Sequence, residues 1–412
     1  MNSSSLLSFF KDLFFMKQLL LNNLEWFYRS GVMIPENGLW GVAERVALTR
    51  NNSALERTMS AFPAWTCHED HCIIEQRRAD CNFQAAFMYL ASYRVFGEKK
   101  FYDTAVNLLD FLYFRSGLLW RKEDRYVPGS WNWSHIKRES VVWFDDESWC
   151  IFLALEIAEK YPELEKKYEM RRFAMMLAPY LAKAMKEAMA PGIGVLEDKT
   201  KHWRSGSFIG PADQPHWGSL ACMALARAYR EDPQQEFMEV LDSYHAYLNE
   251  KADSFDASEV CYAIMGACAA YTYTGKEIFR TTAELFGAKL VSRMGESGNI
   301  PSEHDEAPCG PHLVDTIYTI NWALLGLLGL RAFAPAFDEP FRRALKLVCS
   351  IQDKSPEPHL KGCWRGMYDM NARTWGGGDL FEGGACSIYT GWTNAPISIV
   401  IALELLNEKL FS

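Results

Sequence analysis

The chain lacks the features that would indicate a nucleic-acid partner, a membrane span or a nucleotide cofactor. Its 412 residues include 43 basic and 52 acidic side chains, giving a net charge of −9, with no long basic run. This balance argues against nucleic acid or an anionic membrane surface as the main partner. No uncharged segment reaches the roughly 18 residues that a membrane-spanning helix needs. GxSxG, P-loop and dinucleotide-binding glycine motifs are also missing, so we expect no cofactor.

Cysteine usage gives no support for a metal site. There are eleven cysteines, an odd number that cannot all pair. Many lie in apolar stretches of helical period, where a thiol packs as a small hydrophobic group, and this favours a reducing compartment. The motif CHEDHC at 67–72 could suggest zinc. Because six consecutive residues rarely place four ligands around one tetrahedral ion, and no CxxC pair accompanies them, we predict that no metal binds.

The N-terminal segment is apolar, but it does not read as a signal peptide. Lys11, Asp12 and Lys17 interrupt it, no basic segment precedes it and no small-x-small cleavage site follows. An amphipathic first helix is the better interpretation, and we expect a cytoplasmic location.

Helical periodicity dominates the chain, with almost no convincing strand. The predicted helices are 5–29, 80–96, 98–115, 145–160, 163–189, 214–231, 234–251, 253–274, 276–294, 312–333, 335–353 and 387–410. Short turns alternate with long loops, and short turns join helices into antiparallel hairpins. The long loops are 30–79, 116–144, 190–213, 295–311 and 354–386.

The helices that follow long loops are apolar on every side, as in CIFLALEIA and TINWALLGLLGL, whereas their partners carry one charged face. A helix that is apolar all round belongs in an interior. Six hairpins with an inner and an outer ring make an all-α (α/α)6 barrel, predicted as a single domain over 1–412. An α-solenoid is the alternative, but the repeat lengths vary and the long loops are rich in Gly, Trp and acids.

Three consecutive acids stand where a long loop enters the helix predicted at 145–160, in VVWFDDESWCIFLALEIAEKY. Simple capping needs only one acid at a helix start. Successive helical residues diverge by about 100°, so one of Asp145 and Asp146 is expected to cap and the other to face the cavity. Nearby Trp143 would partly desolvate that carboxyl and raise its pKa toward use as a general acid.

Asp80 opens the preceding inner helix, and taken alone it would be read as a cap. Two acids from neighbouring helices at one rim are what glycosidic-bond chemistry requires, so Asp80 is predicted to share a cavity with Asp145 or Asp146. Tryptophans in the loops suit the faces of a sugar; the candidates are Trp131, Trp133, Trp203, Trp375 and Trp392. The predicted substrate-binding residues are Trp143, His216, Trp217, Arg365, Asp379, Glu382, Tyr389 and Trp392.

This plan, with an Asp opening one inner helix and a W-x-D-D start on the next, resembles the six-hairpin glycosidases. The layout is most similar to the unsaturated glucuronyl and rhamnogalacturonyl hydrolases. That resemblance implies hydration of the C4=C5 bond of an unsaturated uronic acid, with Asp80 and either Asp145 or Asp146 as the acids. The substrate carboxylate would need cations, for which Arg77, Arg78, Arg138, Arg204 and Arg365 are available.

The paired aspartates also look like the helix start of the α-1,6-mannanases. That resemblance implies that the pair acts as nucleophile and acid/base on an intact glycosidic bond. A glycoside hydrolase acting on oligosaccharides is therefore the predicted function. Two alternatives remain: a sugar epimerase on the same barrel, using paired histidines from among His216, His304 and His312, and a non-catalytic carbohydrate-binding barrel.

Overall fold

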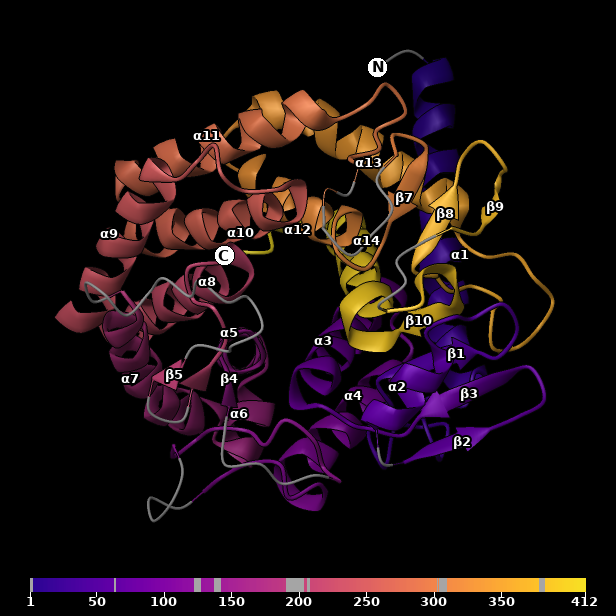
Figure 1. The fold of residues 1–412 in the computed structure, drawn as a ribbon, viewed down its shortest axis with the longest axis horizontal. Coiled ribbons are helices and arrows are strands. Elements are labelled where there is room, and N and C mark those ends of the chain that lie inside the picture. Colours follow the sequence, from indigo (N-terminus) through magenta and orange to yellow (C-terminus); the bar gives the residue numbers. More distant parts are fainter. Residues whose placement is uncertain are drawn as a thin grey trace.

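Two concentric rings of helices form the body of the structure (Figure 1). The computed structural model describes residues 3–62, 64–121, 127–136, 142–189, 204–205, 208–301, 303, 310–377 and 382–412, with backbone only for 3–12 and 204–205. The inner helices are α3 (Ala79–Phe96), α5 (Phe144–Lys160), α8 (Pro215–Glu231), α10 (Ala257–Thr274), α12 (Ile320–Leu330) and α14 (Ala395–Leu406). Each packs against the next, and α14 packs back on α3. The closed ring confirms the predicted (α/α)6 barrel.

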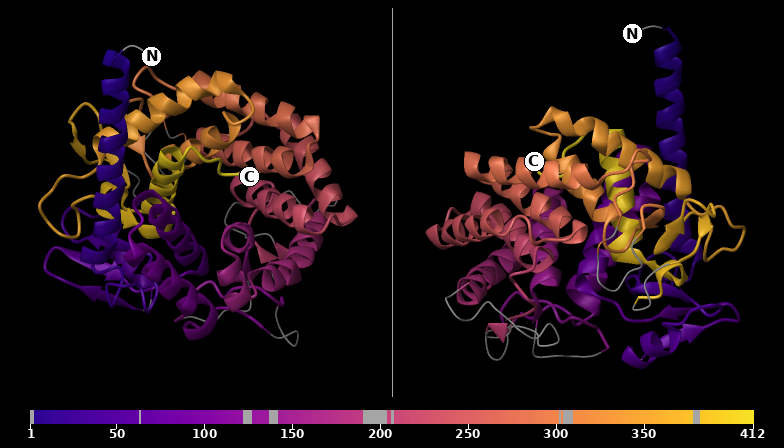
Figure 2. Two further views of the ribbon diagram at one scale, coloured as in Figure 1. Left: turned by 180° about the vertical axis from the view of Figure 1, so that it is seen from behind. Right: turned by 45° about the horizontal axis from the view of Figure 1, so that its top comes forward.

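The outer ring consists of α1 (Ser3–Arg29), α4 (Lys99–Asp110), α7 (Met170–Ala188), α9 (Gln235–Glu250), α11 (Glu277–Arg293) and α13 (Asp338–Ile351). Five inner helices pack on the outer helix that follows them, whereas α14 packs on α1, so the two ends of the chain supply the sixth pair. Figure 2 shows the N-terminal part of α1 extending beyond the rings. No helix of the described residues is both long enough and apolar enough to cross a membrane.

Burial explains why the inner helices are apolar all round. In α10, the side chains from Ala257 to Ala270 are all buried, whereas in α13 the buried positions recur on one face only. The inner helices also approach one another closely. A Cβ on Gly266 of α10 would lie 2.6 Å from the carbonyl oxygen of Ser219 in α8, so a side chain at that position would push these helices apart.

Several predicted boundaries were wrong. The helix predicted at 163–189 is two helices, α6 (Pro162–Tyr168) and α7, separated at Glu169, whose φ is +54°. The helix predicted at 312–333 begins only at Ile320, and the one predicted at 387–410 becomes α-helical at Ala395 after a strand and a π-helical turn. The short helix α2 (Leu55–Ala61) was not predicted.

The expectation of almost no strand was also wrong, because the long loops pair into three small sheets. The first has the order β10-β1-β3-β2 and is antiparallel throughout. The strands are β1 (Arg45–Leu48), β2 (Trp65–Cys67), β3 (His71–Ile74), β4 (Val142–Trp143), β5 (Arg204–Ser205), β6 (Phe208–Ile209), β7 (Leu313–Asp315), β8 (Met367–Asp369), β9 (Thr374–Trp375) and β10 (Ser387–Tyr389). Strands of two to four residues are too short to show a period in the sequence. They form because partly buried loops must satisfy their backbone hydrogen bonds.

Candidate active site

A cavity of about 500 Å³ opens at the N-terminal ends of α5, α8 and α10. These helices contribute acidic side chains and a histidine to its lining. Residues of the segment 45–62 and of the segment 382–392, which precedes α14, line it as well. Its lining residues are Arg45, Arg57, Thr58, Ala61, Phe62, Arg78, Trp133, Trp143, Asp145, Asp146, His216, Trp217, Ser258, Glu259, Tyr262, Tyr318, Glu382 and Trp392. This mixture of flat rings and carboxyl groups suits a sugar that is both stacked and hydrogen-bonded.

The three consecutive acids of α5 divide their roles differently from the prediction. Asp145 and Asp146 both line the cavity, and each is only 7% exposed. Glu147 is buried and accepts hydrogen bonds from the backbone N–H of Trp131 at 2.9 and 3.2 Å. The third acid therefore secures the preceding loop, and the expected division between one capping and one cavity-facing aspartate is replaced by a pair that faces the cavity.

Asp80 does not line the cavity, which corrects the prediction that it would share it with the other two acids. Its side chain is fully buried. Arg78 donates to both Asp80 carboxylate oxygens at 3.2 Å, and Trp392 donates its indole N–H to Oδ2 at 3.1 Å. Arg78 and Trp392, which do line the cavity, lie between Asp80 and the open space. Asp80 thus holds the residues that face the cavity and is not itself exposed to a substrate.

Arg78 is shared among several acids. It also donates to Oδ1 of Asp146, and its guanidinium lies 3.8 Å from Glu44. Burial raises the pKa of Asp146 well above its ordinary value; Arg78 opposes this effect, whereas the charges of Asp80 and Asp145 add to it. Since one cation cannot neutralise three carboxylates, Asp146 is the group expected to retain a proton.

The environment of Asp145 differs. Burial raises its pKa as well, but His216 and Arg78 oppose this effect. Asp146 bonds the shared Arg78 directly, whereas Asp145 has His216 as its first favourable charge, and two neighbouring carboxyl groups in different surroundings are suited to divide the roles of acid and base.

His216 is held by Glu259, an acid that the sequence analysis missed. Glu259 in the first turn of α10 accepts a hydrogen bond from the His216 backbone N–H at 2.7 Å, and its other oxygen hydrogen-bonds the ring Nδ1. The imidazole also lies against the Trp217 ring, with 3.3 Å between the ring centroids. The sequence signal was present: Glu259 is a lone acid in the otherwise apolar stretch SEVCYAIMGACAAY.

A second ion pair, between Arg45 and Glu382, also lines the cavity. Arg45 of β1 pairs with Glu382 at 2.5 Å and lies 4.3 Å above the Tyr389 ring, and Tyr389 donates its hydroxyl hydrogen to Glu382. Burial would raise the pKa of Glu382, but Arg45 and Tyr389 outweigh burial and hold that pKa below its ordinary value. Glu382 is therefore an ionised, anchored carboxylate, poorly suited to donate a proton.

The structure brings together five of the eight predicted substrate-binding residues. Trp143, His216, Trp217, Glu382 and Trp392 line the cavity. Tyr389 is buried behind Glu382. Arg365 lies elsewhere, where its Nε donates to the Ala385 carbonyl at 2.7 Å, and this corrects its assignment. Asp379 lies outside the described residues.

The tryptophans chosen from loops show a mixed outcome. Trp133 and Trp392 line the cavity as predicted. Trp131 is instead buried edge-on against Phe83 and Tyr113, and Trp375 packs on Tyr368 in a rim sheet, so these two predictions were wrong. Trp203 lies outside the described residues. Tryptophans from the loops occur both in the core and in the cavity lining, and the composition of a loop does not show which of the two positions its tryptophan takes.

Comparisons with known proteins identify the fold. No protein-family model matches the sequence, and no curated protein is significantly similar to it. Among solved structures, a sugar epimerase from a ruminal bacterium is 11% identical, with 95% of this chain and 98% of that chain covered and a TM-score of 0.60. An inactive variant of an alpha-1,6-mannanase of Salegentibacter sp. HEL1_6, in complex with alpha-1,6-mannotriose, is 12% identical, with 95% and 100% covered and a TM-score of 0.56.

An unsaturated glucuronyl hydrolase variant with dGlcA-Glc-Rha-Glc is 13% identical, with 86% of this chain and 94% of that chain covered and a TM-score of 0.53. These neighbours are carbohydrate-active enzymes on the six-hairpin fold, and they confirm the architecture predicted from the sequence. They include hydrolases and an epimerase, so the shared fold does not select one chemistry.

Proposed function

We propose that this chain is a glycoside hydrolase that cleaves glycosidic bonds in neutral oligosaccharides, with Asp145 and Asp146 as its catalytic carboxyl groups. One observation carries this proposal. Two adjacent carboxyl groups with raised pKa values face one aromatic-walled cavity. Hydrolysis of a glycosidic bond needs a carboxylic acid to protonate the leaving oxygen and a carboxylate to act at the anomeric carbon or on water.

Asp146 is the proton donor in this mechanism. Its Oδ1 accepts from Arg78, which leaves Oδ2 as the oxygen that carries the transferable proton. That proton passes to the glycosidic oxygen as the C–O bond breaks, and the departing sugar leaves as an alcohol. Asp145, whose charged form is favoured by His216 and Arg78, is the ionised partner. Water supplies the hydroxyl group of the new reducing end and returns a proton to the acid.

The charges around the cavity favour a neutral substrate over an unsaturated uronic acid. Three arginines line the cavity. Arg45 and Arg78 are already paired with Glu382 and with Asp80 and Asp146, and Arg57 is not without a partner either. Four acidic side chains line the same space, Asp145, Asp146, Glu259 and Glu382, and Asp146 is the one assigned a proton. A substrate carboxylate would therefore be placed among like charges at low dielectric.

The other arginines considered as partners for a substrate carboxylate do not add a described positive charge to the cavity. Arg77 is paired with Glu75 at 2.7 Å, and Arg365 is not among the residues that line the cavity. The side chains of Arg138 and Arg204 lie outside the described residues.

The mannanase comparison supports the choice of substrate. That structure is described as an inactive variant with two adjacent aspartates replaced by asparagine and with alpha-1,6-mannotriose bound. Asp145 and Asp146 are the adjacent pair in this chain. An epimerase mechanism with two histidines receives less support, because His216 is the one histidine among the described lining residues. His304 lies outside the described residues.

The purified protein is expected to shorten α-1,6-linked mannotetraose and to leave a glucuronyl oligosaccharide with a C4=C5 bond unchanged. Mass spectrometry of the products measures both reactions. Epimerisation or isomerisation would leave the mass unchanged, so the same measurement separates those activities from hydrolysis. Turnover of the unsaturated substrate alone would contradict the proposed substrate class.

Asp80→Asn is expected to shift the pH profile of hydrolysis. The Asp80 charge raises the pKa of Asp146, so its removal lowers that pKa and leaves Arg78 free to pair more fully with Asp146. A general acid works below its pKa and loses activity as the pH rises through it. The alkaline limb of kcat should therefore move to lower pH.

The control for Asp80→Asn is Glu147→Gln, which removes a buried carboxylate that bonds the Trp131 backbone. For Glu147→Gln, the alkaline limb of the kcat pH profile should lie at the same pH as in the wild type. If Asp80→Asn lowers kcat equally at every pH, Asp80 has only a structural role, and the proposed effect of its charge on the pKa of Asp146 is refuted.

A further inference from the structure

We infer that Asp70, His71 and His359 form a binding site for a late first-row divalent cation such as Zn²⁺. The site lies where the β2–β3 hairpin, at the edge of the molecule (Figure 1), meets the loop that follows α13, and none of its three residues lines the cavity. The inference is independent of the proposed hydrolase activity, because it uses none of the cavity residues.

The geometry brings three ligand atoms together from distant parts of the chain. The ligand atoms of Asp70, His71 and His359 all lie within 4.8 Å of one another. His71 Nδ1 is 2.7 Å from one Asp70 oxygen, and His359 Nε2 is 3.8 Å from the other. The second distance is too long for a direct hydrogen bond. The Asp70 carboxylate therefore lies between two imidazoles but is within hydrogen-bond distance of His71 alone.

The surroundings hold these groups in place. The His71 and His359 side chains are 12% and 7% exposed, whereas Asp70 is 43% exposed. A disulfide between Cys67 and Cys72 closes the turn that carries Asp70 and His71. The His359 carbonyl accepts the indole N–H of Trp26 in α1 at 2.8 Å, which anchors its segment. Two ligands are thus built into the fold, and the third can move to meet a cation.

The ligand chemistry matches a borderline-soft cation. Two neutral imidazoles and one carboxylate form a common ligand set for zinc, with metal–ligand distances of about 2.0–2.2 Å. Around a tetrahedral ion, ligand atoms at that distance lie about 3.4 Å from one another, so the most widely separated ligand atoms of the cluster must approach by up to about 1.4 Å. The His71 and His359 rings are stacked 4.0 Å apart at 13°, and one ring must also turn so that both lone pairs meet the ion.

CHEDHC alone did not predict this site, because its own residues do not supply the set. His68 stacks on His71 with 4.6 Å between centroids, but it is exposed and lies outside the three-residue cluster. The missing ligand, His359, is 288 positions beyond His71 in the sequence (359 − 71). It arrives from the loop that follows α13.

A bound cation would connect two rim segments. β3 carries His71 and pairs with β1, the strand of Arg45, and β1 pairs in turn with β10, the strand of Tyr389. His359 belongs to the segment that leads to β8. The cation would therefore tie the four-stranded sheet beside the cavity to the loop packed on α1, and it would stabilise the folded state in proportion to its occupancy.

Isothermal titration of the full chain with ZnCl₂ alone, after removal of chelator, is expected to show one saturable site. Zn²⁺ should also raise the melting temperature of the wild type. His359→Ala should weaken binding by at least about tenfold, since even partners that contact only the ligands contribute 10- to 100-fold. Because His359 is buried, Asp70→Asn at a more exposed position provides a second test, and it should weaken binding in the same way.

His312→Ala is the matched control, since this histidine lies outside the cluster, and it should bind Zn²⁺ like the wild type. His68→Ala should also retain binding within about threefold. The inference is overturned if no saturable binding is found. It is equally overturned if His68→Ala abolishes binding while His359→Ala and Asp70→Asn leave it unchanged, because the hairpin histidines would then capture the ion by themselves.

Discussion

Asp146→Asn is expected to lower kcat for oligosaccharide hydrolysis by about 10²- to 10⁴-fold, the usual contribution of a positioned general acid. Asparagine keeps the shape of the side chain and its contact with Arg78, but it has no transferable carboxyl proton. Asp145→Asn should cause a comparable loss, because both side chains face the cavity and each has a separate role. Initial rates on α-1,6-linked mannotetraose provide the measurement.

The stability of Asp146→Asn should move in the opposite direction from its activity. Burial raises the pKa of Asp146 in the folded state. A carboxyl group with a raised folded-state pKa costs stability as the pH rises from its unfolded to its folded pKa, because unfolding then releases a proton. Removing the group should leave the melting temperature at pH 7 unchanged or higher, and the difference from wild type should shrink at acid pH.

Glu147→Gln is the matched control for both substitutions, since Glu147 is the next residue of the same helical turn and is buried away from the cavity. It should retain most activity. If Asp145→Asn and Asp146→Asn keep near-wild-type rates, the catalytic carboxyl groups lie elsewhere in the cavity.

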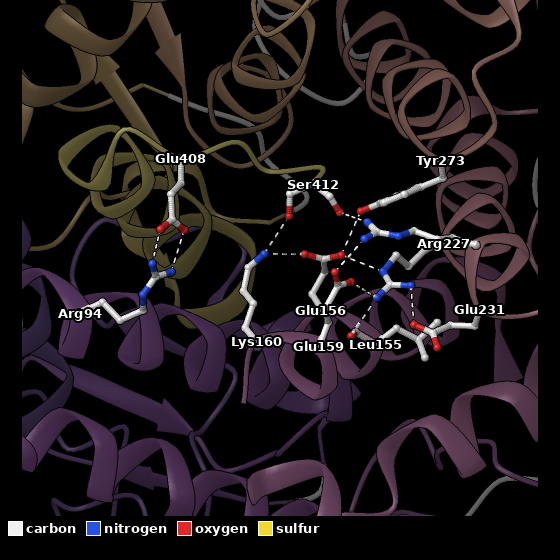
Figure 3. Close-up of polar contacts among 11 residues, drawn as sticks. Arg94, Leu155, Glu156, Glu159, Lys160, Arg227, Glu231, Tyr273, Glu408 and Ser412 are labelled. Carbon is white, nitrogen blue, oxygen red and sulfur yellow. Dashed lines mark hydrogen bonds and ion pairs between the residues drawn. The ribbon is translucent and has the colours of Figure 1, made fainter. Parts of the chain in front are cut away.

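Arg227→Leu is expected to lower the free energy of unfolding by about 3–5 kcal/mol, the range for removing one partner of a buried ion pair. Arg227 lies near the C-terminal end of α8, at the end of the barrel opposite the cavity, and its side chain is fully buried. It pairs with Glu156 at 2.8 Å, with Glu159 at 2.7 Å and with Glu231 at 2.8 Å (Figure 3). Leucine at this position would leave the fully buried Glu156 without its main cation.

Figure 3 also shows Tyr273 donating its hydroxyl hydrogen to Glu156, and Lys160 pairing with the same carboxylate. These contacts do not replace a buried guanidinium. Urea denaturation followed by circular dichroism measures the effect. Arg280→Leu is the matched control, because Arg280 pairs with Glu284 on the surface and its removal should change stability little.

Adding Glu156→Gln to Arg227→Leu should recover part of the loss, since the uncompensated charge is then removed. Equal unfolding midpoints for Arg227→Leu and Arg280→Leu would show that the network contributes no more than a surface pair.

The sequence was sufficient to predict the ring because burial leaves a simple pattern. Inner helices such as α10 and α14 are apolar on every side, and a closed double ring is one way to bury six such helices. The start of α12 was misassigned because the apolar residues of Leu313–Asp315 form a buried strand, and a short apolar run has no distinguishing period.

The site was predicted only in part because sequence shows where a residue enters the rim and not how deep its side chain lies. Asp80 and Asp145 both stand at the start of an inner helix, yet Trp392 and Arg78 cover Asp80. Trp392 is 312 positions away from Asp80, so no local pattern could show this. Glu259 was missed for a different reason: its helix was predicted to begin at 253, which placed this acid inside the helix and not at its start, whereas α10 begins at Ala257.

The most direct test of the account compares the wild type with the double variant Asp145→Asn/Asp146→Asn on α-1,6-linked mannotetraose, using mass spectrometry to follow chain length. The account predicts that the wild type releases shorter mannosides, each cleavage adding one water, and that the double variant leaves the tetrasaccharide intact while remaining folded. Shortening at equal rates by both proteins, or a wild-type product of unchanged mass, would contradict it.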